Sequence, residues 1–197
     1  MAPMRSPDTA ATELAEKEQQ CLLETAAQSI ETGLATGSPL RIEAAHYAPA
    51  LQGHRASFVT LQIKGALRGC IGSLEASRPL IEDVAQNAFA AAFRDPRFQP
   101  LAGAEYGLLD IHISVLSHPE PMTFADEQDL LTQIRPRVDG LILQAAGRRG
   151  TFLPSVWESL PETLGFLRQL KRKTGLPEDY WSADLRVWRY TTTSIPA

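Results

Sequence analysis

The sequence has few of the residues that mark a metal site or a disulfide framework. Its 197 residues include two cysteines, Cys21 and Cys70, and four histidines. Neither cysteine belongs to a C-x-x-C pair, and no cysteine–histidine cluster has the spacing of a zinc site. We therefore expect no metal and no cofactor. Two isolated cysteines favour a reducing compartment, the cytoplasm, and nothing in the sequence supports the alternative, a Cys21–Cys70 disulfide.

Long apolar runs and an excess of positive charge are also missing. No segment is long and apolar enough for a transmembrane helix, and the N-terminus lacks the apolar core of a signal peptide. Nineteen basic and 23 acidic residues give a formal net charge of −4. This balance argues against nucleic-acid binding through a basic surface, so we expect neither a nucleic acid nor a membrane as partner. The 44% of hydrophobic residues is enough for a real core.

Periodicity predicts a mixture of helices and hairpins. Apolar residues at helical spacing predict helices over residues 12–37, with Gly33 and Gly37 at the end, and over 79–94, 127–134 and 162–173. Alternating patterns predict strands over residues 57–63, 67–73, 109–116, 140–145, 151–153 and 185–191, with a turn at 147–150. Hairpins mixed with helices indicate an α+β fold with antiparallel or mixed sheets and flanking helices. We expect residues 1–10 to be disordered and 11–197 to fold.

The most specific stretch is Leu67-Arg68-Gly69-Cys70-Ile71-Gly72-Ser73. In a regular strand, Arg68, Cys70 and Gly72 share one face, and the opposite face carries Leu67, Gly69 and Ile71. Arg68 would then favour the thiolate of Cys70, and Gly72 would let a ligand approach the backbone. The motif therefore predicts a reactive or ligand-binding site.

Each of these residues also has a simpler explanation. Cys70 is a nucleophile or ligand-contact thiol, or else a small buried residue in a tight hairpin. Arg68 binds a carboxylate or phosphate, or else it forms an ion pair with Asp95 or Glu75. His112 is a general base for Cys70 if their strands are neighbours, or else an alternating polar residue of a strand.

The segment Asp95-Pro96-Arg97-Phe98 follows the predicted helix 79–94 and has two interpretations. Asp95 and Arg97 orient Arg68 or a substrate, or else Asp95-Pro96 only stops the helix and Phe98 anchors the core. Five basic residues form either a patch for an anionic partner or a solvated turn and a helix end that complements the helix dipole, namely Arg148, Arg149, Lys171, Arg172 and Lys173.

Several of these segments occur in the same order in the AMMECR domain family, the family of the AMME syndrome chromosomal-region protein. The matching segments are Phe58–Leu61, Leu67–Gly72, Asp95–Pro100, Ile113–Leu116 and Thr151–Pro154. The resemblance runs from about Leu14 to Thr191. Bacterial members are also called AmmeMemoRadiSam system protein A. The resemblance implies two intertwined sub-domains, the larger from both chain ends and the smaller from the middle, with a cleft near the cysteine motif.

The resemblance implies no established reaction, so whether the chain is an enzyme stays open. The system name implies a Memo-like protein and a radical-SAM protein as partners in a modification pathway. We predict a small anionic ligand or a partner segment at a cleft lined by Arg68, Gly69, Gly72, Asp95, Arg97, Thr151 and Phe152. The alternative is a cysteine-dependent transferase or hydrolase with Cys70 as nucleophile.

Overall fold

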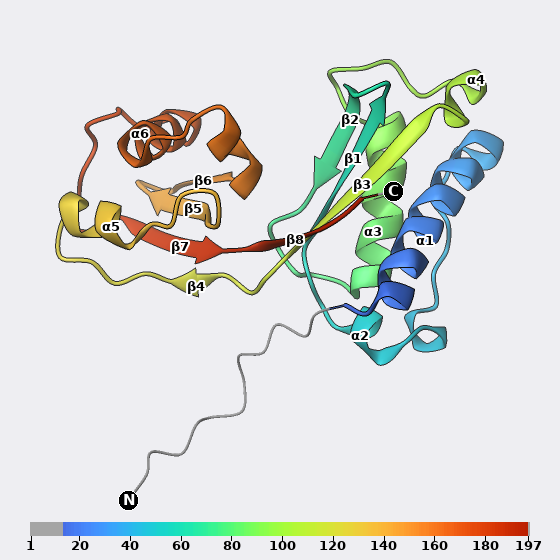
Figure 1. Ribbon diagram of the computed structural model, residues 1–197, viewed down its shortest axis with the longest axis horizontal. Coiled ribbons are helices and arrows are strands. Elements are labelled where there is room, and N and C mark those ends of the chain that lie inside the picture. The colour runs from blue at the N-terminus through green and yellow to red at the C-terminus, as the bar shows by residue number, and fades with distance from the viewer. Residues whose placement is uncertain (1–13, 197) are drawn as a thin grey trace, which may run out of the picture. The chain divides into compact units, whose positions relative to one another are not determined.

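The computed structural model describes residues 14–196 (Figure 1). The predicted disorder of residues 1–10 lies outside this range. The chain divides into two compact units. Unit 1 contains the chain up to Leu116 and resumes at Thr193, and unit 2 is Ser117–Thr192.

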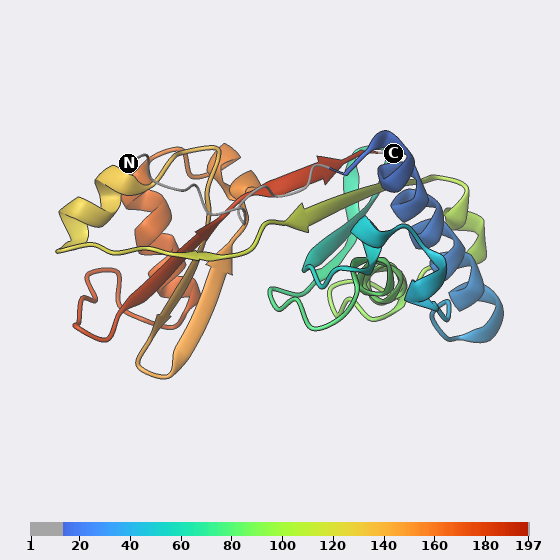
Figure 2. The ribbon, with the colours of Figure 1, turned by 90° about the horizontal axis from the view of Figure 1, so that it is seen from below.

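Unit 1 is a four-stranded sheet with two long helices on one side. The strand order is β2-β1-β3-β8, where β1 is Ser57–Ile63, β2 is Ala66–Gly72, β3 is Leu109–Leu116 and β8 is Thr192–Ile195. The two helices are α1, Glu16–Thr36, and α3, Leu80–Phe93, and both views place them on the same side of the sheet (Figures 1 and 2). Short helices lie in the connections: η1 Ala44–His46, α2 Pro49–Gln52 and α4 Gly103–Tyr106.

The core of unit 1 lies between α3 and the sheet. The helical stripe that the sequence predicts is buried, with Ile81, Val84 and Ala88 at 0% exposure. Every second residue of β3 is buried against it, from Ile111 to Val115. The opposite face of β3 carries the polar alternation that the sequence predicts. The sheet therefore has one apolar face under the helices and one polar face.

Helix α1 ends where one of the two predicted glycines requires it. Gly37 has a φ of +71°, a left-handed conformation that costs glycine little, and its N–H donates to Gly33 O. The expectation that Gly33 also ends the helix is wrong. Gly33 is a buried residue inside α1, and its bare Cα allows the rings of Phe89 and Phe93 to pack directly on the helix.

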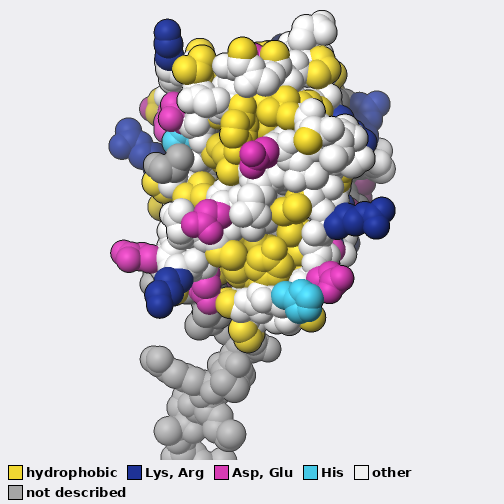
Figure 3. Space-filling model, turned by 90° about the vertical axis from the view of Figure 1, so that its right-hand side faces the viewer, with side chains coloured by type: hydrophobic (Ala, Val, Ile, Leu, Met, Phe, Trp, Pro, Cys, Tyr) yellow, Lys and Arg dark blue, Asp and Glu magenta, His cyan; other side chains and the backbone are white. Residues whose placement is uncertain are grey.

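The α1 side of unit 1 mixes residue types (Figure 3). Hydrophobic side chains run down the middle of this face with acidic side chains among them, and the lysine and arginine side chains stand apart toward the margins. Among residues 14–196, this face therefore presents no basic patch.

Unit 2 has a second antiparallel sheet, of order β4-β7-β5-β6. Its strands are β4 Glu120–Pro121, β5 Gly140–Ala145, β6 Arg148–Phe152 and β7 Arg186–Tyr190, and its helices are α5 Glu127–Gln133, η2 Pro154–Glu158 and α6 Thr163–Lys173. Trp157 stacks on Phe166 in the core, with ring centroids 3.8 Å apart. Helix α6 ends at Gly175 as a Schellman motif, because Leu176 N donates to Lys171 O and Gly175 N to Arg172 O.

Two sequence-based details of unit 2 are wrong. The turn of its hairpin is Ala146-Gly147, with φ of +50° and +71°, so Arg148 and Arg149 belong to β6 and not to the turn. Lys171 lies in the last turn of α6, as predicted, but it cannot belong to a basic surface patch. It is 0% exposed and forms an ion pair with Glu127 of α5.

The α+β prediction, with antiparallel sheets and flanking helices, is confirmed. Within residues 14–196, no helix is long and apolar enough to cross a membrane. Over the same range, no three His, Cys, Asp or Glu side chains lie together as metal ligands would. The predicted cleft between sub-domains stays a prediction.

Candidate functional site in unit 1

The cysteine motif forms β2, the outer strand of the unit 1 sheet, and the strand is irregular. Leu61 pairs with Gly69 and Gln62 pairs with Leu67, so Arg68 is an extra residue, a β-bulge. The bulge shifts the alternation by one residue. Leu67 therefore lies on the Cys70 face, and the prediction that places it with Gly69 and Ile71 is wrong.

Arg68 forms an ion pair with the carboxylate of Glu105. Its Nε donates to Glu105 Oε1 at 2.8 Å and its Nη2 to Glu105 Oε2 at 3.0 Å, a bidentate pair. Nη2 also donates to the carbonyl oxygen of Gln99. The ion-pair interpretation of Arg68 is thus correct in kind, but neither Asp95 nor Glu75 is the partner. Because the guanidinium is bound to Glu105, Arg68 is not the cation that the sequence predicts beside the thiol.

The Arg68–Glu105 ion pair makes the free energy of unfolding depend on pH in the acidic range. The hydrogen bonds from Arg68 lower the pKa of Glu105 from 4.5 to about 2. A carboxyl group whose pKa is lowered by folding stabilises the fold above its unfolded pKa, and this contribution disappears as pH falls through the folded value. We expect Glu105→Gln to flatten the loss of unfolding free energy between pH 4.5 and about 2.

Urea titrations at several pH values measure this effect. Glu178→Gln is the matched control, because Glu178 belongs to an exposed ion pair with Arg172 whose side chains are 44% and 60% exposed. Equal acid sensitivity of the wild type and Glu105→Gln would contradict the prediction.

Asp95 and Arg97 hold the backbone of Cys70. Asp95 is 4% exposed and its Oδ2 accepts the Cys70 N–H at 2.9 Å. Arg97 donates from Nε to Asp95 Oδ1 at 2.9 Å and from Nη2 to Oδ2 at 2.7 Å, and Nη2 also reaches the Cys70 carbonyl oxygen at 3.2 Å. These contacts, the Arg97 side chain first, hold the pKa of the Asp95 carboxyl far below its usual range.

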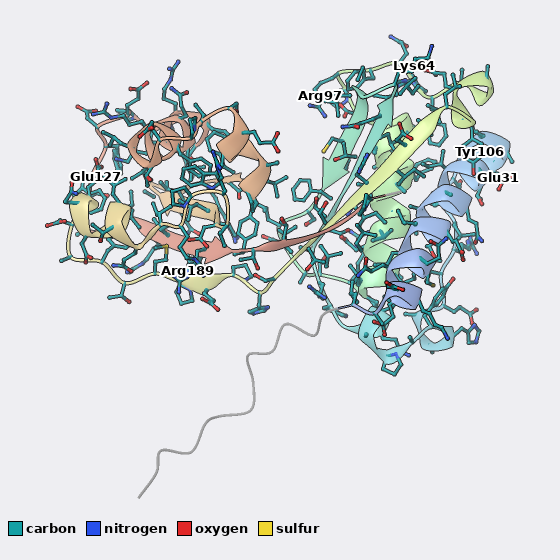
Figure 4. All side chains as sticks on the ribbon, in the orientation of Figure 1. Glu31, Lys64, Arg97, Tyr106, Glu127 and Arg189 are labelled. Carbon is teal, nitrogen blue, oxygen red and sulfur yellow. The ribbon has the colours of Figure 1, made fainter. Side chains whose placement is uncertain are left out.

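Arg97, labelled in Figure 4, is the cation that contacts Cys70, through its carbonyl oxygen. Asp95 is the main reason that the pKa of Arg97 is raised, and the Cys70 side chain adds to the effect. Asp95 and Arg97 therefore do more than end α3, but the group that they position is Cys70 and not Arg68. Phe98 is not a core anchor: it is half-buried, and the guanidinium groups of Arg68 and Arg97 lie over its ring, 5.8 and 5.6 Å from the centroid.

Cys70 lies in a polar row across three strands. It pairs with Thr60 of β1, and Thr60 pairs with His112 of β3. The Thr60 hydroxyl donates to Cys70 Sγ at 3.3 Å. Because β1 separates the strands of Cys70 and His112, their backbones are about 9.5 Å apart at normal strand spacing. The strands are not neighbours, so the condition on which His112 would serve as a base for Cys70 is not met.

The two glycines of the motif are explained by packing inside unit 1. A Cβ on Gly69 would overlap the carbonyl oxygen of Ala91 in α3. A Cβ on Gly72 would overlap the ring of Phe58 and the carbonyl oxygen of Ser57. Helix α3 therefore approaches β2 directly at Gly69, and the aromatic ring of Phe58 fills the space at Gly72 that the sequence assigns to a ligand.

Thr151 and Phe152 lie in unit 2 and stabilise that unit. The Thr151 hydroxyl donates to Leu141 O at 2.7 Å and lies 2.9 Å from the Tyr190 hydroxyl. The Phe152 ring packs edge-on against Phe166, with centroids 5.2 Å apart. Burial raises the pKa of Tyr190 to about 12. That Thr151 and Phe152 line one cleft with Cys70 stays a prediction.

Sequence reasoning missed two residues of the site, Glu105 and Thr60. Glu105 is the only carboxylate between Asp95 and Asp110, which was a usable signal for the partner of Arg68. Thr60 gave no such signal, because its contact with Cys70 depends on the register of β1 and β2.

A family model, AMMECR1, matches residues 23–195 of the chain. The chain belongs to the AMMECR1 family. Among its relatives, a protein of Methanothermobacter thermautotrophicus is 36% identical over 183 residues, which covers 90% of this chain and 93% of that protein. A protein of Methanosarcina acetivorans is 34% identical over 178 residues, which covers 89% of each chain.

A solved structure with the AMMECR1 fold of this chain is the crystal structure of an uncharacterised protein from Pyrococcus horikoshii. It superimposes with a TM-score of 0.82 at 32% identity and covers 92% of each chain. The resemblance drawn from the cysteine motif is thus confirmed at the level of the family.

Proposed function

We propose that this AMMECR1 chain is a binding protein that holds an anionic group, from a small molecule or a partner segment, beside Cys70. The observation that carries this proposal is that the Arg97 guanidinium is held in place on one edge and exposed on the other. The Arg97 side chain is 53% exposed, although Asp95 fixes Nε and Nη2. Among residues 14–196, none accepts a hydrogen bond from its Nη1. A guanidinium that is oriented in advance and open on one edge is suited to a carboxylate or phosphate.

The chemistry of Cys70 provides a direct test of an anion site. Iodoacetate carries a negative charge and iodoacetamide does not, so the ratio of their alkylation rates reports the local charge at each thiol. We expect this ratio to be about fivefold higher at Cys70 than at Cys21, since a nearby cation is worth on the order of 1 kcal/mol in water. Cys21 is an internal control, because burial and the charge of Glu24 raise the pKa of its thiol.

Arg97→Ala should lower the Cys70 ratio to that of Cys21, and Arg172→Ala, which removes an exposed arginine of unit 2, should leave it unchanged. Mass spectrometry of the two cysteine-containing peptides gives both ratios from one sample. Equal ratios at Cys70 and Cys21 in the wild type would overturn the proposal.

The same assay separates the two sources of the anionic group. The family resemblance supports Memo-like and radical-SAM proteins as partners in a modification pathway. If the group belongs to a partner segment, a purified Memo-like or radical-SAM protein should slow alkylation of Cys70 and not of Cys21. If it belongs to a small molecule, inorganic phosphate alone should do so.

The alternative function, a transferase or hydrolase with Cys70 as nucleophile, is favoured by two contacts of Cys70. The Thr60 hydroxyl donates to Cys70 Sγ, and the Arg97 guanidinium donates to the carbonyl oxygen of the same residue. A cysteine nucleophile also needs a base, and His112 lies on β3, beyond β1. This alternative requires Cys70 to react with iodoacetamide faster than a free thiol at neutral pH, and a slower reaction would exclude it.

A further inference from the structure

The outer edge of β2 carries main-chain groups that an added strand would need, and side chains already bind them. β2 is the terminal strand of its sheet. Such a strand presents N–H and C=O groups to any extended chain that approaches it. At Cys70, however, the N–H donates to Asp95 and the C=O accepts from Arg97. We propose that Asp95 and Arg97 form a clip that closes this edge and prevents β2 from pairing with β2 of a second copy of the chain.

The geometry of the clip reproduces that of a neighbouring strand. The Asp95 carboxylate accepts at 2.9 Å where the C=O of a neighbouring strand would accept, and the Arg97 guanidinium donates at 3.2 Å where its N–H would donate. The two side chains also hold each other, because Arg97 N and Nε both donate to Asp95 Oδ1. One short segment thus satisfies both main-chain groups of Cys70.

Two further features protect the same edge. The bulge at Arg68 interrupts the regular pairing of β2, and bulges are a common way to prevent strand addition. Arg68 Nη2 donates to Gln99 O at 3.0 Å, so the segment that follows the clip is also tied to the strand. The two residues that flank Gly69, Arg68 and Cys70, are therefore both hydrogen-bonded to the segment that follows α3.

A second copy is the expected occupant, because the edge is self-complementary at Cys70. Two β2 strands related by a two-fold axis would exchange the Cys70 N–H and C=O in both directions, as an isologous interface requires. Leu67, which is 44% exposed, would add apolar contact on the same strand. This inference concerns the main chain of Cys70, which Arg97 contacts through Nη2. It is independent of the proposed anion site, which uses Nη1 of Arg97.

The test is to open the clip and measure association. In a Cys21→Ser background, Asp95→Ala combined with Arg97→Ala frees both main-chain groups of Cys70. In a β2–β2 pair the two Cys70 Cα atoms would be about 5.5 Å apart, within the range of a disulfide bond. A mild oxidant should then link Cys70 to Cys70, with a dimer yield at least about tenfold above that of the Cys21→Ser parent, in which the clip is intact, since each hydrogen bond gained between the strands is worth on the order of 1 kcal/mol.

The matched control is Arg172→Ala combined with Glu178→Ala, which removes an exposed arginine–acid pair of unit 2. It should stay monomeric in light scattering and give the parental yield. A folded double variant that remains monomeric, or that dimerises without forming the Cys70–Cys70 disulfide, would overturn the proposal.

If the double variant fails to fold by circular dichroism, Asp95→Ser combined with Arg97→Ala decides the question. Serine keeps a polar side chain at the buried position of Asp95 but is too short to replace the carboxylate at the Cys70 N–H, so both main-chain groups of Cys70 are again free. More Cys70–Cys70 dimer than in the parent supports the clip, and no increase overturns it.

Discussion

Replacing Gly69 by alanine should lower the free energy of unfolding by about 3 kcal/mol or more, the upper range for overpacking a rigid core. The added methyl group would overlap the carbonyl oxygen of Ala91 and come close to its carbonyl carbon. Both are backbone atoms of α3, so no side-chain rotation can make room. The helix would have to move away from β2, and the buried contacts of Ala88 and Ala91 would loosen.

Gly103→Ala is the control for this change. A Cβ at Gly103 has no heavy atom within 4 Å, so we expect it to alter the free energy by less than about 1 kcal/mol, through the entropy of the unfolded chain. Urea denaturation of both variants provides the measurement. A Gly69→Ala protein as stable as Gly103→Ala would show that α3 does not press on β2 as described.

Replacing Asp83 by alanine should have a similar cost, about 3 kcal/mol, because it leaves several buried donors without a partner. Asp83 is 1% exposed. Its Oδ2 accepts from Ser57 N at 2.9 Å, from Ser57 Oγ at 2.6 Å and from Asn87 Nδ2 at 2.8 Å. This one carboxylate oxygen therefore joins α3 to the first residue of β1.

Asp83→Asn separates the loss of the acceptor from the loss of the charge. The asparagine carbonyl can still accept from Ser57, so we expect a smaller loss than with alanine, by more than about 1 kcal/mol. Thermal and urea unfolding of the two variants measure the difference. If both variants lose the same free energy, the ion pair between Asp83 and Arg78, at 3.5 Å, and not the hydrogen-bonded network, carries the stabilisation.

The sequence predicts regular elements well where one period continues without interruption. The alternation over residues 109–116 gave β3 with its bounds as observed, and the stripe from Ile81 to Phe93 gave the buried face of α3. The predicted alternation of side chains failed at Arg68. This one bulged residue moves Leu67, which precedes it in β2, to the opposite face of the sheet. β8 was missed for a different reason: its partner strand is β3, far away in sequence, and its short pattern has no period of its own.

The candidate site was harder to predict than the fold. The sequence identified Cys70, Arg68, Asp95 and Arg97 but paired the charges wrongly. Arg68 and Glu105 are 37 residues apart in sequence, and only the connection through α4 brings them together. The contact of Asp95 with the Cys70 N–H could not be predicted from the sequence either. Every residue except proline carries a main-chain N–H, so nothing in the sequence marks this one as the partner of Asp95.

The path of the chain through the two units has a consequence for how the protein could have arisen. Unit 2 interrupts unit 1 between β3 and β8, and its two ends are joined by hydrogen bonds: Ser117 N donates to Thr191 O, and Thr191 N donates to Ser117 Oγ, both at 2.9 Å. An inserted module whose ends meet can be gained or removed with little disturbance of its host. Ser117 and Thr191 mark an insertion site, at which a short loop could replace the whole of unit 2 and leave the strand order of unit 1 unchanged.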